Sequence, residues 1–394
     1  MEKMELIELK KHKMEDEIYI CAQCGFCHEV CPIYEEIGWE SASPRGKIYW
    51  LKHILKPGPL PVIEIDKEFA NRFFQCTICG HCSEVCQTKI NTPELWKAIR
   101  TEIYQRGLWP DVLNELIEAL KKEKNVYSMP NDERTIWAMD IEEEIRTKVR
   151  KKAKVAYFVG CISSFMGRLA DIPLSTVRIM EHAGINFTVL GSEEWCCGNP
   201  LFLAGASSLA EEIVRYNVAT LCKLGVETLI TTCSGCYRAW KQEYPEILKE
   251  DLGFEVLHVS QFLAKLVDEG KLKLRSIDGV VTYHDPCEIG RHCNIYEEPR
   301  KVLENIPKIK FVELPKTKKD CKCCGGGGML KATNPELAAK IASRKIDETT
   351  EVGANILTSG CPACKLNLMD AIFEREATVE MLDITEVVAR ALGS

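Results

Sequence analysis

The sequence lacks any long hydrophobic run. No stretch of the 394 residues approaches 18 consecutive apolar residues, so we expect no helix of its own that spans a membrane. The first 17 residues, MEKMELIELKKHKMEDE, alternate in charge and contain no apolar core, so we expect no signal peptide. These absences indicate a cytosolic protein, in which thiols stay reduced.

Motifs that bind nucleotides are also missing. Gly325–Gly328 is a run of four glycines, but no Lys-Ser or Lys-Thr pair follows it, so it is not a phosphate-binding loop. No GxGxxG occurs, and any flavin or nicotinamide must therefore come from a partner. The net charge of −7 is spread along the chain, which argues against nucleic acid as a ligand.

Cysteine, by contrast, is abundant. The chain contains 21 cysteines, about 5% of its residues, which is below the 8–10% typical of short disulfide-bonded scaffolds. In a long chain with reduced thiols, such a pattern is more typical of metal binding or catalysis than of disulfide bonding.

The first eight cysteines form two copies of C-x2-C-x2-C-x3-C. Three closely spaced thiolates bind one face of a cubane [4Fe-4S] cluster, and in two-cluster ferredoxins the fourth binds the other cluster. We expect each fourth cysteine to begin a helix that leads away from its motif. This scheme assigns one cubane to Cys21, Cys24, Cys27 and Cys86, and the other to Cys76, Cys79, Cys82 and Cys31.

Two zinc sites are the alternative, but zinc ribbons use two pairs of cysteines rather than three plus one. The second motif has Gln87 where proline is usual, which affects only the turn after the cluster. Between the motifs lie 44 residues that include SPRGKIYWLKHIL, a sequence with a helical start and helical apolar spacing. We therefore predict a helical two-cluster ferredoxin domain over residues 1–110.

Residues 111–152 are predicted to connect this domain to the rest. DVLNELIEALKKEKN, directly after Pro110, has the pattern of an amphipathic helix. Its apolar face contains Leu113, Leu116, Ile117 and Leu120. The charged segment EEEIRTKVRKKAK predicts a solvated connector, although a functional charge patch is an alternative.

The remaining residues contain an internal duplication. Cys161 recurs as Cys287, Cys196–Cys197 as Cys323–Cys324, and Cys233 with Cys236 as Cys361 with Cys364. The shifts are 126, 127 and 128 residues, a register too regular for chance. We predict a first module over 153–275 and a second over 276–394.

Each module alternates apolar strands with helices. VAYFVG, TLITT, VVTYHD and NILTS are predicted strands that each lead into a cysteine. Ligands of open α/β sheets bind outside the carboxyl ends of the strands, so the five cysteines of a module should converge at one edge. The glycines after each cysteine pair should let the backbone approach a cluster, and Ser260 and Thr385 are predicted helix N-caps. The predicted fold class is α+β multidomain, with a helical ferredoxin domain before two pseudo-symmetric α/β modules.

The spacings C-x34-CC-x35-C-x2-C and C-x35-CC-x36-C-x2-C resemble the cysteine-rich CCG domains of the B subunit of heterodisulfide reductase. The front domain resembles the C subunit of that enzyme, and the fused order resembles the D subunit of the membrane-linked form. The chain is also similar to the iron–sulfur subunits of glycolate and lactate dehydrogenases and to the B subunit of thiol:fumarate reductase.

The resemblance implies one noncubane [4Fe-4S] cluster in each module. It assigns Cys161, Cys196, Cys197, Cys233 and Cys236 to the first, and Cys287, Cys323, Cys324, Cys361 and Cys364 to the second. It also implies reduction of a disulfide such as the coenzyme M–coenzyme B heterodisulfide of methanogenesis, or the reverse reaction, with the substrate between the modules. Two one-electron transfers would come from the noncubane clusters, which the cubanes feed.

Alternatives remain open at this point. The second module could hold zinc, and the chain could be an electron-transfer subunit of a flavin-dependent glycolate or lactate dehydrogenase with no substrate of its own. Either function needs an electron-donor partner, a flavoprotein or a membrane cytochrome b-type protein, which could place the chain at the membrane periphery. The presence of all five cysteines in both modules favours the reductase.

Three further residues are candidates for catalysis. His284 or His292 could supply a proton to a leaving thiolate, although His284 could equally be a strand residue bonded to backbone. Arg291 could bind an anionic group of the substrate or form a structural ion pair. Cys222, Cys293 and Cys321 are left over, and Cys222 is predicted to be a small core residue of a helix.

Overall fold

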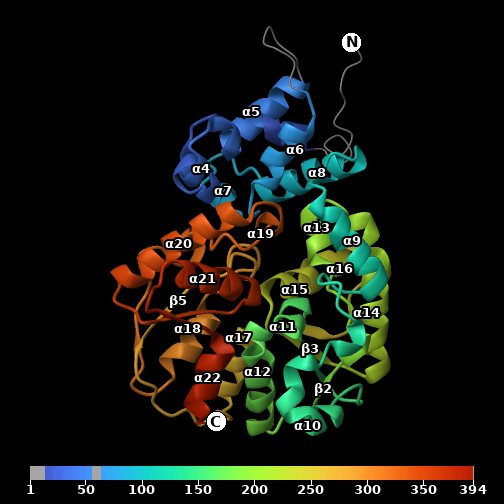
Figure 1. Cartoon of the computed structure of the whole chain (residues 1–394), viewed down its shortest axis with the longest axis vertical. Helices are drawn as coiled ribbons and strands as arrows, with labels where there is room; N and C mark the ends of the chain where they lie inside the picture. Colours follow the sequence, from blue (N-terminus) through green and yellow to red (C-terminus); the bar gives the residue numbers. More distant parts are fainter. Residues whose placement is uncertain (1–13, 56–63, 394) are drawn as a thin grey trace.

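The computed structural model describes residues 14–55 and 64–393, and its N-terminal part is helical (Figure 1). In the described part of residues 14–110 there is no strand. The helices are α2 (Glu15–Ile20), α3 (Phe26–Glu29), α4 (Pro32–Ile37), η1 (Glu40–Ala42), α5 (Pro44–Leu55), α6 (Lys67–Phe74), α7 (His81–Glu84) and α8 (Thr92–Gln105). The helical character of the ferredoxin domain and the helix at SPRGKIYWLKHIL are thus confirmed.

The segments directly after the two cysteine motifs differ. Cys31 is the N-cap of α4, and its sulfur accepts a hydrogen bond from the backbone N–H of Tyr34. After Cys86 the chain makes a turn, and the next helix, α8, begins only at Thr92. The prediction of a helix at each fourth cysteine is therefore correct for Cys31 and wrong for Cys86, because Gln87 replaces the proline that starts α4.

Most of the connector packs against the first module, and its first helix also contacts the second module. It contains α9 (Val112–Glu123), η2 (Asn131–Glu133), η3 (Ile136–Ile141) and α10 (Glu142–Arg146). α9 buries Leu113, Ile117 and Leu120, as its apolar pattern predicts. The expectation of a solvated connector is wrong in part, because Ile145 is buried and Val149 forms a parallel bridge with Val189.

The two modules have the same topology. The first contains β1 (Val155–Phe158), α11 (Cys161–Phe165), η4 (Gly167–Leu169), α12 (Asp171–His182), β2 (Phe187–Val189), η5 (Gly191–Glu193), α13 (Asn199–Ala204), η6 (Ser207–Leu209), α14 (Glu211–Leu224), β3 (Thr228–Thr231), α15 (Ser234–Arg238), η7 (Ala239–Glu243), α16 (Tyr244–Leu248), β4 (Glu255–His258) and α17 (Val259–Asp268). The second contains β5 (Val280–Tyr283), α18 (Glu297–Glu304), β6 (Lys310–Phe311), η8 (Lys318–Asp320), α19 (Leu330–Thr333), α20 (Pro335–Glu351), β7 (Ile356–Ser359), α21 (Pro362–Glu374), β8 (Glu380–Asp383) and α22 (Ile384–Leu392). The sheet orders, β2-β1-β3-β4 and β6-β5-β7-β8, are equivalent and all the pairings are parallel. The internal duplication is therefore also a duplication of structure.

The N-caps of the last helix in each module lie two residues earlier than predicted. His258 caps α17 and accepts a hydrogen bond from Ser260 N–H, while Asp383 caps α22 and accepts one from Thr385 N–H. A glutamine or glutamate three residues after each cap completes a capping box.

Each module sends its last helix to the other module. α17 packs against α18, and α22 packs against α12 (Figure 1). The apolar side chains of these helices form one cluster that includes Phe262, Val302, Met180 and Val388. The modules therefore share a hydrophobic core, which fixes their relative position.

Arg100 of α8 joins the ferredoxin domain to both modules. Its guanidinium is fully buried and donates hydrogen bonds to the carbonyl oxygens of Phe73 and Cys76 within its own domain. It also donates to Leu203 O of the first module at 2.7 Å and to Gly328 O of the second at 2.8 Å. One side chain thus satisfies backbone acceptors from all three domains.

The glycine run after the second cysteine pair serves the same junction. A Cβ on Gly328 would lie 2.3 Å from the backbone carbon of Thr77, so this glycine lets the cubane-motif loop approach the second module. The atoms that crowd Gly328 thus belong to a neighbouring domain, and the approach of the backbone to a cluster at these glycines stays a prediction.

Replacing Gly328 with alanine should loosen this junction. Gly353 is the matched control, because its φ of +67° is close to the +61° of Gly328 but nothing lies within 4 Å of its Cβ position. Both alanines carry left-handed backbone strain, and Gly328→Ala adds an overpacking cost of about 1–3 kcal/mol. We expect a lower thermal unfolding midpoint for Gly328→Ala than for Gly353→Ala; equal midpoints would contradict the close packing.

Candidate metal centres

The eight motif cysteines line two adjacent cavities of the ferredoxin domain. The first, which we term the outer cavity, is lined by Cys21, Cys24, Cys27 and Cys86. The second, the inner cavity, is lined by Cys31, Cys76, Cys79 and Cys82. Cys82 also reaches the outer cavity. Each cavity thus brings together three cysteines of one motif and the fourth of the other, as the crossed scheme groups them.

The two cavities differ in exposure. Cys24 at the outer cavity is the only exposed member of the eight, whereas Cys79 at the inner cavity is buried. Burial raises the pKa of both Cys27 and Cys31 to about 12. The outer cavity is therefore the one that lies nearest to solvent.

A buried lysine lies at the inner cavity. Lys47 lines it, is 2% exposed and donates a hydrogen bond to Gln75 O. Burial lowers its pKa, while the nearby Cys76 and Cys31 act in the opposite direction. A cation at this position offsets the negative charge of thiolates bound to a metal centre.

The five cysteines of the first module form a continuous set. Each is buried, and their side chains are in contact in the order Cys161, Cys196, Cys197, Cys236 and Cys233. Cys161 follows β1 and Cys233 follows β3, so the carboxyl edge of the sheet positions both. This is the convergence that the strand pattern predicts.

The second module repeats this arrangement. Its side-chain contacts run from Cys287 through Cys323, Cys324 and Cys364 to Cys361. The sulfur atoms of Cys324 and Cys364 lie 3.2 Å apart.

Two further contacts join these sets to each other and to the inner cavity. Cys79 of the inner cavity contacts Cys323 of the second module, which in turn contacts Cys287. Cys233 of the first module contacts Cys361 of the second. The thiols therefore form a series that runs from the inner cavity to the second module and then to the first. The spacing of the cysteines in the sequence contains no signal for either contact.

The crowding of these thiols fits a multi-iron group. All 21 cysteines lie in the described residues and none forms a disulfide. Neighbouring thiols and burial raise the pKa of Cys79, Cys287 and Cys364 well above the usual range, because adjacent thiolates repel one another in a buried site. A bound iron–sulfur cluster supplies the positive charge that removes this penalty.

Zinc in the second module has its own geometric basis. The ligand atoms of His284, Cys324 and Cys364 lie within 4.8 Å of one another, and all three residues are buried. Nitrogen and sulfur donors of this kind also suit zinc. Elemental composition distinguishes the two assignments.

His284 faces the second cysteine set, whereas Arg291 and His292 face the ferredoxin domain. His284 Nδ1 lies 3.4 Å from Cys321 Sγ. Arg291 donates to Cys79 O at 2.7 Å and to Cys321 O at 2.6 Å. His292 Nε2 bonds with Ile78 O at 2.9 Å, and burial lowers the pKa of His292 to about 4.

The three leftover cysteines occupy different environments. Cys222 is exposed on α14, so its prediction as a core residue is wrong. Cys293 is partly buried beside Gln242, which donates to its sulfur. Cys321 is fully buried, with Lys345 Nζ 3.8 Å from its sulfur.

Several buried ion pairs near the cysteines were not identified from the sequence. Arg134 pairs with Glu194 at 2.9 Å beside the first set, and Arg238 pairs with Glu288 at 3.0 Å across the boundary between the modules. Arg238 and Glu288 lie next to the ligand motifs in sequence, a signal that could have identified them. Arg134 lies in the connector, where no motif marks it.

Comparison with known proteins identifies the family. Residues 17–90 match the 4Fe-4S dicluster domain, and residues 155–240 and 281–369 each match the cysteine-rich domain CCG. The chain is 38% identical over 394 residues to the D subunit of dihydromethanophenazine:CoB–CoM heterodisulfide reductase from Methanosarcina mazei, and 36% identical to that from Methanosarcina acetivorans. In both cases the match covers 96% of this chain and 94% of the relative. The chain belongs to the family of heterodisulfide reductase D subunits.

Membership in this family makes the chain an iron–sulfur subunit of an oxidoreductase, as the resemblance implied. A more distant relative is the B subunit of fumarate reductase (CoM/CoB) from Methanothermobacter marburgensis. It is 29% identical, over 94% of this chain and 72% of the relative. Within the described residues, no helix has the length and hydrophobicity to cross a bilayer.

Pairs of alanine substitutions test the crossed grouping of cysteines. If Cys24 and Cys86 bind one cluster, the double variant Cys24→Ala/Cys86→Ala should lose about four iron atoms per chain. Cys76→Ala/Cys86→Ala should lose about eight, because it removes a ligand from each cubane. Iron analysis of the anaerobically purified variants measures both losses, and the reverse pattern would show that each motif binds its own cluster.

Proposed function

We propose that the chain is the catalytic iron–sulfur subunit that reduces a disulfide of the coenzyme M–coenzyme B type. The contact between Cys233 and Cys361 carries this proposal. It brings the two five-cysteine sets to a common boundary, where we propose that a bound disulfide presents one sulfur to each set.

The proposed cofactors are two cubane [4Fe-4S] clusters in the outer and inner cavities and one noncubane [4Fe-4S] cluster in each module. When bound, these clusters supply single electrons, of which one disulfide requires two for conversion into two thiolates. The residues proposed to hold them are the eighteen cysteines of the two motifs and the two modules, with zinc in the second module as the alternative.

The series of thiol contacts supports an order of electron transfer. Cys24 is exposed at the outer cavity, where an electron-donor subunit, a flavoprotein or a membrane cytochrome b-type protein, could approach. From the inner cavity, the contact between Cys79 and Cys323 leads to the second module. We propose that electrons reach the first module only through the second.

The candidate catalytic residues separate by the groups that they contact. Arg291 and His292 bind main-chain carbonyls of the ferredoxin domain, and we propose that they hold the inner cavity against the second module. His284 stays the candidate for proton transfer to a product thiolate, because its ring faces the second cysteine set.

Polar groups at the boundary between the modules fit a polar substrate. Arg238 lies two residues after Cys236, Glu288 directly follows Cys287, and their ion pair crosses the boundary. Glu288 Oε1 is buried and has no hydrogen-bond partner in the described structure, so it can accept one from a bound molecule.

Oxidation of the reduced protein by its substrate tests the proposal. We expect about sixteen iron atoms and no zinc per chain in the anaerobic protein. After reduction, the coenzyme M–coenzyme B heterodisulfide should reoxidise the clusters, whereas the two free thiols, as the control, should not. Visible absorption and EPR spectroscopy follow the reaction.

Failure of the disulfide to oxidise the clusters would contradict the proposed catalytic function. If an electron acceptor such as a quinone analogue still oxidised the same protein, the chain would be an electron-transfer subunit without its own substrate. Zinc in place of four of the iron atoms would show that one module holds zinc, and the donor set of His284, Cys324 and Cys364 favours the second.

A further inference from the structure

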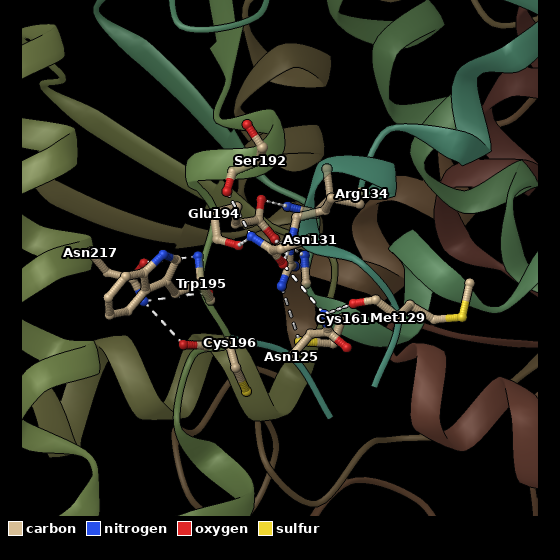
Figure 2. Close-up of polar contacts among 12 residues, drawn as sticks. Asn125, Met129, Asn131, Arg134, Cys161, Ser192, Glu194, Trp195, Cys196 and Asn217 are labelled. Carbon is tan, nitrogen blue, oxygen red and sulfur yellow. Dashed lines mark hydrogen bonds and ion pairs between the residues drawn. The ribbon is translucent and has the colours of Figure 1, made fainter. Parts of the chain in front are cut away.

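The connector places a buried arginine against the first cysteine set. Arg134 follows η2 and is 1% exposed. Its Nη2–H donates to Cys161 Sγ at a distance of 3.5 Å (Figure 2). A residue outside both modules thus supplies a hydrogen bond to a proposed cluster ligand.

Polar contacts hold the guanidinium in this orientation. Arg134 Nη1 donates to Glu194 Oε1 at 2.9 Å, and Arg134 Nε donates to Asn131 Oδ1 at 3.1 Å. Asn131 in turn donates from Nδ2 to Ser192 O at 2.6 Å (Figure 2). Because Asn131 and Glu194 hold Nε and Nη1 of the guanidinium in place, its remaining nitrogen, Nη2, points to Cys161.

Glu194 is itself fixed by the turn that carries Cys161. Its two carboxylate oxygens accept the backbone N–H groups of Val159 and Gly160 at 2.9 and 2.8 Å. The carboxylate is therefore bound to the backbone before the cysteine, and the guanidinium is the group that bonds to the sulfur. Buried polar groups that are this fully paired form a rigid unit.

The second module lacks this unit at the equivalent place. Glu194 lies two residues before Cys196, and the residue two before Cys323 is Cys321. The sulfur of Cys321 contacts His284 and Lys345 rather than an arginine. The two otherwise pseudo-symmetric sites therefore differ in the hydrogen bond that Arg134 makes.

We propose that Arg134 is a positioning residue that raises the reduction potential of the iron–sulfur centre of the first module, and of that centre alone. An N–H group donated to a ligand sulfur, together with a buried positive charge, stabilises the reduced and more negative state of a cluster. The inference rests on the proposed function, since it requires a cluster in the first module. The raised reduction potential would make the centre of the first module the favoured final acceptor of the electron-transfer series.

A redox titration followed by EPR spectroscopy tests this role. In Arg134→Met, the potential of one of the two module centres should fall by about 59 mV, which is a tenfold change in the equilibrium constant of a one-electron centre. The other module centre should keep its potential. Arg134→Lys, which retains the charge, should show a smaller fall.

Arg300→Met is the matched control. Arg300 is also buried in an ion pair, but it binds Asp285 and Glu313 of the second module and no ligand sulfur, so its removal should leave the potential of the first-module centre unchanged. Unchanged potentials in Arg134→Met, or an equal fall in both, would overturn the inference. So would loss of the first-module signal in Arg134→Met and Arg134→Lys together, because Arg134 would then serve assembly.

The wild-type titration separates the two proposals. If it showed no module centres beyond the two cubanes, the proposed function would fail and this inference with it. If it showed both module centres, but Arg134→Met left them unaltered, only the inference would fail.

Discussion

The contact between Cys233 and Cys361 depends on the way in which the two modules share one core. Parallel strands gather five thiols at the carboxyl edge of each sheet, but this alone would give two separate sites. The exchange of the terminal helices α17 and α22 turns the two edges toward each other. A boundary that both cysteine sets reach is therefore a consequence of how apolar side chains pack far from it.

The charges around the thiols make the sites depend on assembly of the whole chain. Lys47 and Arg100 of the ferredoxin domain lie near Cys76, while Arg291 of the second module binds Cys79 O. Each buried cation lies beside thiols that would otherwise repel one another. Folding of the three domains and formation of the metal centres are thus coupled, because each domain supplies charge or hydrogen bonds to another.

The sequence predicted the features that depend on local spacing. The two cubane motifs and the duplicated modules follow from the spacing of the cysteines, and the strands that lead into Cys161, Cys233, Cys287 and Cys361 follow from apolar runs. The structure contains these strands and the duplication. Features that depend on tertiary contact were missed. Arg134 has no motif, Cys222 faces solvent on a helix with several apolar residues, and the capping role fell to His258 rather than Ser260.

Selective removal of the iron–sulfur centre of one module tests most directly the proposed order of electron transfer, in which electrons reach the first module only through the second. Cys323→Ser should disable the centre of the second module, and Cys197→Ser that of the first. Freeze-quench EPR after mixing with a reduced viologen should show the first-module centre still oxidised in Cys323→Ser after both cubanes are reduced. The second-module centre of Cys197→Ser should be reduced at the wild-type rate. Reduction of the first-module centre at an unchanged rate in Cys323→Ser would contradict the account.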